Sequence, residues 1–132
     1  MENLPTIKTT LCLSADLFDL DLITEKMGIK PTKTRTKDSF PSYGLPHTVW
    51  TIEVFEKECW AISAPLEKLF KILEGKAKTI KFLCEEYELE AIIVITIHMN
   101  HGERPEMDIP REFISFAGFI NAEIGFDLYC YE

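Results

Sequence analysis

The residues whose types and spacing are best suited to chemistry lie at the end of one apolar segment: His98, His101 and Glu103. A His-x-x-His spacing at a strand end can bring two imidazoles together, and a carboxylate would complete a metal site. Catalytic zinc signatures normally place their histidines on a helix or add a distant third ligand. A packed, hydrogen-bonded imidazole on a sheet face is the competing interpretation of His98. We therefore keep a small metal- or ligand-binding enzyme centred on these residues as the alternative function, and expect no cofactor.

Other reactive residue types have simpler explanations. Asp16, Asp19, Asp21 and Glu25 are spaced like calcium ligands, but the central glycine and terminal bidentate glutamate of a calcium loop are missing, so helix capping is preferred. The four cysteines form no Cys-x-x-Cys pair and have no histidine at a spacing typical of a nucleophile: Cys12, Cys59, Cys84 and Cys130. They are interpreted as small buried hydrophobes in a reducing, cytoplasmic compartment. No signal peptide and no membrane span are expected from the sequence.

Charge says more about partners than these motifs do. Fourteen Lys and Arg residues against twenty-two Asp and Glu residues give a net charge of −8, which argues against a nucleic-acid-binding protein. An acidic surface instead favours steering of a basic protein partner. Two acidic groups are candidates for a docking patch: Glu53, Glu56 and Glu58, and Glu85, Glu86, Glu88 and Glu90. All of them except Glu90 are taken as candidate docking residues. The basic run at residues 30–37 is interpreted as a solvated segment, because it lacks interleaved aromatic residues for base stacking.

The element that must position these residues is the β-branched segment at residues 91–99, which is apolar at nearly every position. Such a strand is expected inside a sheet, covered on both faces. Alternating patterns predict further strands over residues 6–15, 47–55 and 123–131. Residues 30–37 fit either a polar edge strand or a mobile loop.

Helix signals fill the intervals between the strands. Asp19 or Asp21 supplies an N-cap for a short helix that ends at Gly28. Ser63 caps a helical region that either breaks or bends at Gly75. A last helix begins near Pro110 and is capped by the preceding residues at 108–109. The sequence thus predicts one α+β domain over residues 1–132. Its four- to five-stranded, mostly antiparallel sheet carries three to four helices chiefly on one face.

Four segments in order carry a family resemblance: FDLDLITEKMGIKPT at residues 18–32, VWTI at 49–52, LEKLFKIL at 66–73 and DIPREFISFAGFINAEIGFDLY at 108–129. Together they resemble the bacterial family catalogued as domain of unknown function 4279, over nearly the whole chain. The sequence departs from the family pattern at Ser14 and Ala15, where a glycine is common. It departs again at residues 37–39, which replace a lysine-glycine-acid step.

The resemblance implies a small cytosolic protein and carries over no catalytic residue, since the family has no established activity. It also implies that some members are coded beside toxins, as immunity proteins are. Our leading hypothesis is a non-enzymatic immunity protein that binds and neutralises a basic, nuclease-type toxin. Self-association through exposed Tyr129 and Tyr131 is a third possibility.

Overall fold

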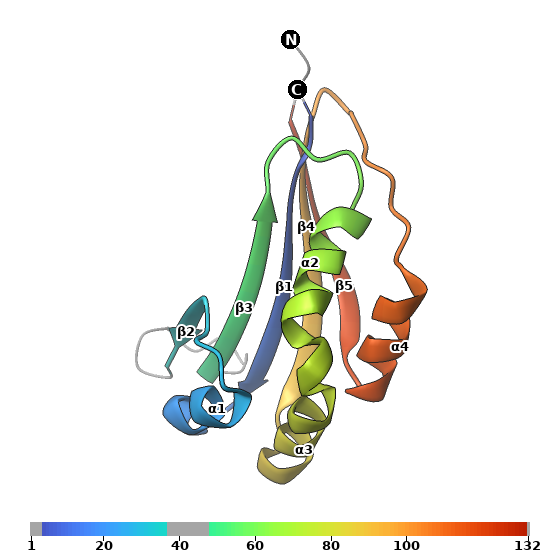
Figure 1. Cartoon of the computed structure of the whole chain (residues 1–132). Coiled ribbons are helices and arrows are strands. Elements are labelled where there is room, and N and C mark those ends of the chain that lie inside the picture. Colours follow the sequence, from blue (N-terminus) through green and yellow to red (C-terminus); the bar gives the residue numbers. More distant parts are fainter. Residues whose placement is uncertain (1–3, 37–47, 132) are drawn as a thin grey trace.

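The computed structural model describes residues 4–36 and 48–131. A five-stranded sheet runs through it in the order β2-β3-β1-β4-β5 (Figure 1). The strands are β1 (Thr6–Ala15), β2 (Lys33–Arg35), β3 (Thr48–Glu56), β4 (Glu90–Asn100) and β5 (Glu123–Tyr131). The helices are α1 (Leu20–Met27), α2 (Ser63–Leu73), the one-turn 3₁₀ helix η2 (Glu74–Lys76), α3 (Ala77–Tyr87) and α4 (Arg111–Phe119).

The sheet is mixed but mostly antiparallel. β1 pairs antiparallel with both β3 and β4, and β2 pairs antiparallel with β3. β5 is parallel to β4, because the segment that contains α4 carries the chain back to the end of the sheet where β4 begins. These observations confirm the predicted α+β class and strand number.

The helices pack on one face of the sheet and the hydrophobic core lies between the two layers (Figure 1). Alternation along the strands supplies the sheet side of the core: Ile7, Leu11, Leu13, Ile93, Ile95 and Ile97. The helices supply stripes at three- and four-residue spacing, including Leu66, Leu69 and Leu73 of α2. No helix in the described residues is long and apolar enough to cross a membrane.

The position of β4 confirms one part of its prediction and corrects another. β4 lies inside the sheet, between β1 and β5. Among residues 4–36 and 48–131, however, helices cover only one of its faces, and Ile92 and Val94 on the second face are half-buried. Isoleucine and valine at these positions therefore reflect strand propensity as much as burial. We call this second face of the sheet the uncovered face.

Local signals at α1 and β2 are also confirmed. The Asp19 carboxylate accepts hydrogen bonds from the backbone N–H groups of Asp21 and Leu22 at 3.0 and 3.2 Å. Gly28 ends α1 with φ at 73°, a left-handed conformation that glycine adopts without steric cost. β2 is an exposed edge strand, as one interpretation of residues 30–37 predicted. Residue 37 and the rest of the segment up to residue 47 lie outside the described residues.

Two capping predictions are wrong. Ser63 is already inside α2, whose N-cap is Ile62 with no side-chain cap. Pro110, and not a residue at 108–109, is the N-cap of α4. Pro65 and Leu66, in the first turn of α2, are buried, and this packing stabilises the start of the helix without a hydrogen bond from the Ser63 hydroxyl. The helical region does break at Gly75, within η2.

The expectation of buried cysteines holds for three thiols in part and fails for Cys130, which is exposed on β5. Burial, assisted by the nearby Glu85 carboxylate, raises the pKa of Cys84 to about 11. Burial also raises the pKa of Cys12. Because only the thiolate reacts, these two thiols are protected by burial and by their protonation.

We therefore expect iodoacetamide near neutral pH to alkylate Cys130 well before Cys12 and Cys84. A time course of peptide masses measures the alkylation rate of each cysteine. The control is the same time course in concentrated urea, where all the thiols are exposed and should react at similar rates. Faster labelling of Cys84 than of Cys130 in the folded protein would contradict the structure.

Candidate protein-docking site

His98 is packed and hydrogen-bonded. Its Nδ1 lies 2.8 Å from the Tyr131 hydroxyl oxygen. Its ring stacks on those of Tyr129 and Tyr131, at centroid distances of 4.6 and 5.8 Å. His101 lies in the turn after β4, with φ at 55°. Within residues 4–36 and 48–131, no three His, Cys, Asp or Glu side chains are grouped so that they could hold a metal ion. The geometry gives no support to a site at His98, His101 and Glu103.

The two predicted acidic groups lie at opposite ends of the sheet. Ile7 of β1 lies opposite Glu56, whereas Ser14 lies opposite Glu90, the last residue of the second group. Seven residues of extended chain separate these positions, about 23 Å. The six predicted glutamates therefore do not form one docking surface.

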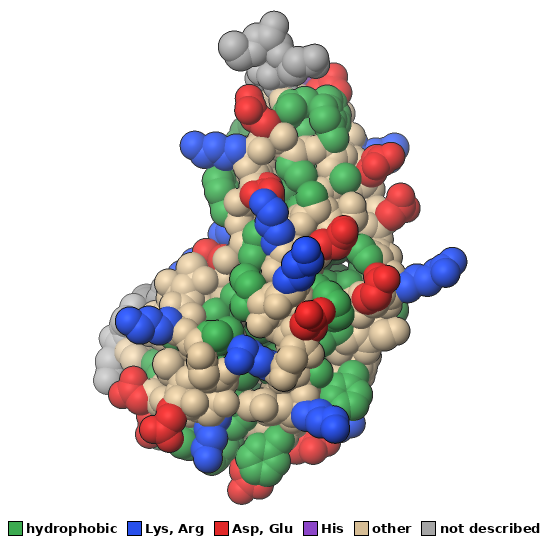
Figure 2. Space-filling view, in the orientation of Figure 1, with side chains coloured by type: hydrophobic (Ala, Val, Ile, Leu, Met, Phe, Trp, Pro, Cys, Tyr) green, Lys and Arg blue, Asp and Glu red, His purple; other side chains and the backbone are tan. Residues whose placement is uncertain are grey.

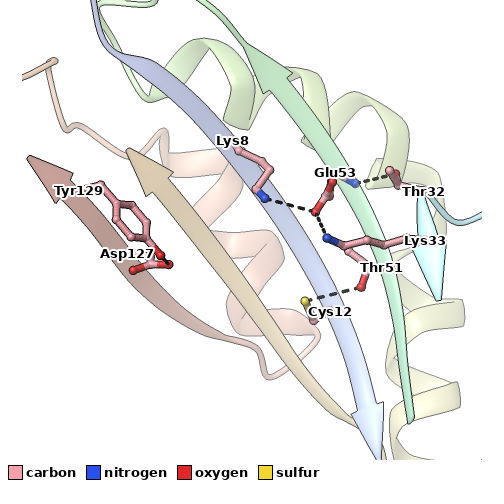
Figure 3. A network of polar contacts seen from close by, with 8 residues as sticks. All are labelled: Lys8, Cys12, Thr32, Lys33, Thr51, Glu53, Asp127 and Tyr129. Carbon is pink, nitrogen blue, oxygen red and sulfur yellow. Dashed lines mark hydrogen bonds and ion pairs between the residues drawn. The ribbon is translucent and has the colours of Figure 1, made fainter. Parts of the chain in front are cut away.

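Two glutamates of the first acidic group form ion pairs with lysine side chains of the same chain. Glu53 lies on the uncovered face, 3.1 Å from Lys33 Nζ and 3.6 Å from Lys8 Nζ (Figure 3). Glu56 pairs with Lys68 of α2 at 2.6 Å. Glu58 lies in the connection from β3 to α2, with φ at 50°. Two of these three carboxylates are thus largely neutralised before any partner arrives.

The second group borders a groove at the other end of the sheet. The groove has a volume of about 460 Å³ and lies where α3 and α4 end and β4 and β5 begin. Glu85, Glu90 and Glu123 line it; Glu86 and Glu88 do not. We call these lining residues, with Lys81 and Phe119, the acidic groove. Glu123 was missed by sequence reasoning, and only the pairing of Ile92 with Glu123 brings it beside Glu90.

Two tight reversals build the acidic groove. Glu88 ends α3 in the left-handed conformation, and Leu89 N–H donates to the Cys84 carbonyl at 3.0 Å. Asn121 after α4 has φ at 59°, and Ala122 N–H donates to the Ala117 carbonyl at 2.8 Å. Each reversal turns a helix directly into a strand. Both helix C-termini therefore lie at the same end of the sheet.

The electrostatics of the acidic groove are unusual for helix ends. A helix C-terminus carries partial negative charge and is normally stabilised by Lys, Arg or His in the last turn. Neither α3 nor α4 has a basic residue there, and α3 instead carries Glu85. Among the described residues, Glu85, Glu90 and Glu123 have no ion-pair partner. The described lining of the acidic groove thus contains three carboxylates and one lysine, Lys81, and carries a net negative charge.

A family model described as "Domain of unknown function (DUF4279)" matches residues 5–131 of the chain. The chain belongs to this family. No curated protein and no solved structure matches it. The match spans every described helix and strand of this DUF4279 domain, so the acidic groove is built entirely from the family's own fold.

An aromatic side chain completes the acidic groove of this DUF4279 domain. Phe119 is 43% exposed at the end of α4. The Lys81 Nζ lies 4.9 Å from the centroid of its ring, a cation–π contact. Elsewhere on the helix face, Lys and Arg side chains are interspersed with Asp and Glu (Figure 2). The acidic groove thus combines three carboxylates that have no ion-pair partner among the described residues with a partly exposed aromatic ring.

Proposed function

We propose that this DUF4279 domain is a non-enzymatic protein-binding protein of the bacterial cytoplasm whose acidic groove docks a basic protein. The observation that carries the proposal is the convergence of Glu85, Glu90 and Glu123 at two helix C-termini, where Lys81 is the one basic residue lining the groove among the described residues. An Arg or Lys of the partner would neutralise these carboxylates and could take the place of Lys81 over Phe119.

The partner we propose is a toxin, which makes the protein an immunity protein. Toxins that cleave nucleic acids need basic surfaces to hold the phosphate backbone, and an acidic protein can occlude such a surface. The net charge of −8 accelerates encounter with such a partner. The family resemblance, which implies members coded beside toxins, points in the same direction.

The test is a matched pair of affinity purifications at low salt. Wild-type bait is expected to retain one basic protein that elutes at high salt, and the E85Q/E90Q/E123Q bait is expected to lose it. A bait carrying E56Q and E58Q at the opposite end is the control and should retain the protein. Co-expression of the domain with the captured protein should then protect cells from its toxicity. Retention of the basic protein by the triple variant would show that the acidic groove is not the docking site. Absence of protection in cells would overturn the immunity role.

A second candidate role, self-association, is favoured by the exposed edge of β5. The Tyr131 carbonyl accepts a hydrogen bond from His101 N–H on the β4 side. Because backbone groups alternate along a strand, the even-numbered residues of β5 direct theirs away from β4. In the described part of the chain no backbone group pairs with them. Phe126 and Leu128, at two of these positions, are 44% and 52% exposed.

β5 also lacks the usual protection of an edge strand, since no Lys, Arg or Pro occurs between residues 123 and 131. A second copy pairing antiparallel through β5 would extend the sheet across a two-fold axis. Sedimentation over a range of protein concentrations should then show a dimer that L128K abolishes. The control is F82K, which changes an exposed aromatic residue on α3. A monomer at every concentration would exclude this role.

A further inference from the structure

The uncovered face of the sheet contains a cavity that the acidic groove does not explain. Its volume is about 370 Å³, within the range of small-molecule sites. Side chains from four neighbouring strands line it. Among them, Lys33 comes from β2, Glu53 from β3, Lys8 and Thr10 from β1, and Val94 and Thr96 from β4.

Two buried threonines that line this cavity, Thr10 and Thr96, have hydroxyl groups without a hydrogen-bond partner in the described residues. Thr10 and Thr96 are 5% and 8% exposed, and in the described residues neither side chain has a hydrogen bond. No fully enclosed side-chain oxygen or nitrogen there lacks a partner, so both hydroxyl oxygens remain accessible from the cavity. Thr9, on the opposite face of β1, shows the contrast, because its hydroxyl donates to the Pro65 carbonyl at 3.1 Å. Accessible hydroxyls without a protein partner are available to a ligand.

The charged residues around the cavity are mostly basic, whereas the whole protein is acidic. Lys8 and Lys33 converge on the single carboxylate of Glu53 (Figure 3), and Arg35 lines the same cavity. Two lysines thus share one carboxylate on this face of a chain whose net charge is −8. Strand alternation places Lys33 and Arg35 on this face, so the basic run that sequence analysis left as solvated forms one wall of the cavity.

We infer that this cavity binds a small organic anion, a carboxylate or a phosphate monoester. Its charged group would lie between Lys8 and Lys33, its hydrogen-bonding oxygens against Thr10 and Thr96, and its apolar part against Val94. Glu53 holds the two lysine side chains in place in the absence of ligand and competes with the anion for them. The site is independent of the proposed docking function, because it lies on a face of the sheet and not at its end.

The experiment is a titration of the ¹⁵N-labelled protein with inorganic phosphate and, separately, with succinate, followed by amide chemical shifts at constant ionic strength. We expect saturable shifts at the amides of Lys8, Thr10 and Thr96. Comparison of the two anions shows which charged group the site prefers. The K33M variant should weaken binding about tenfold, because a charge-assisted contact is lost. T10V, which keeps the shape of the side chain, should weaken it about fivefold.

The E53Q variant is the most discriminating test. It should strengthen anion binding because it releases both lysines, whereas a general loss of structure would weaken anion binding. K78Q on the exposed surface of α3 removes one positive charge elsewhere and should leave binding unchanged. The proposal would be overturned by non-saturable shifts, by equal effects of K78Q and K33M, or by weaker binding to E53Q. Binding of single-stranded RNA without any response to the small anions would also overturn it.

Discussion

Replacement of Trp50 by alanine is expected to lower the free energy of unfolding by about 3–5 kcal/mol, the range for truncation of a large buried aromatic residue. Trp50 is fully buried on β3, opposite Leu13 of β1. Its indole N–H donates to the Thr24 hydroxyl of α1 at 2.9 Å. The variant therefore loses core packing and the hydrogen bond that fastens α1 to the sheet.

The second tryptophan of the chain is the matched control. Trp60 is 45% exposed, so W60A should change the free energy of unfolding by less than about 1 kcal/mol. Urea unfolding followed by far-ultraviolet circular dichroism compares both variants with the wild type on the same signal. T24V should fall between them, at about 1–2 kcal/mol, because it leaves the buried indole N–H without an acceptor. Equal effects of W50A and W60A would contradict the packing described for β3.

Charge reversal in the acidic groove is expected to slow association with a basic partner about tenfold or more at low salt. The variant E85K/E123K places two positive charges where the partner's cations would approach, beside two helix C-termini. Because the effect is one of long-range steering, the difference from the wild type should shrink as salt is raised. Stopped-flow association rates against ionic strength measure it.

The control for this prediction lies at the other end of the sheet. E58K, in the β3–α2 connection, changes the net charge by the same amount per substitution but leaves the acidic groove intact. It should slow association only slightly. If E58K slows association as much as each single groove reversal, the partner responds to the net charge of the protein and not to the acidic groove.

Much of the secondary structure was predictable because its causes are local. The alternation of Ile7, Leu11 and Leu13 with polar residues specifies a strand with one buried face, whatever lies beside it. Asp19 and Gly28 bound α1 through contacts with residues of the same helix. The caps of α2 and α4 were not predictable in this way, because tertiary packing fixes both helix starts without a side-chain cap.

The candidate sites also differ in whether local sequence or tertiary packing determines them. From the sequence, Glu85, Glu86 and Glu88 could be proposed as one group, since they are neighbours in the chain, but only Glu85 of these three lines the acidic groove. The place of Glu123 among them could not, because it depends on the parallel pairing of β5 with β4. For His98 the sequence left two interpretations open, a metal ligand and a packed imidazole, and its contacts with Tyr129 and Tyr131 show the packed one.

The sequence by itself determined the α+β class, the position of most strands and helices, the acidic balance and the family. Each of these depends on composition or on residues within a few positions of one another. Only the tertiary structure decided that Lys8 meets Lys33 and Glu53 on the uncovered face, and that Glu85, Glu90 and Glu123 share one groove. Those meetings depend on strand order and register. These are set by the free energy of pairing segments far apart in the chain, which no local pattern records.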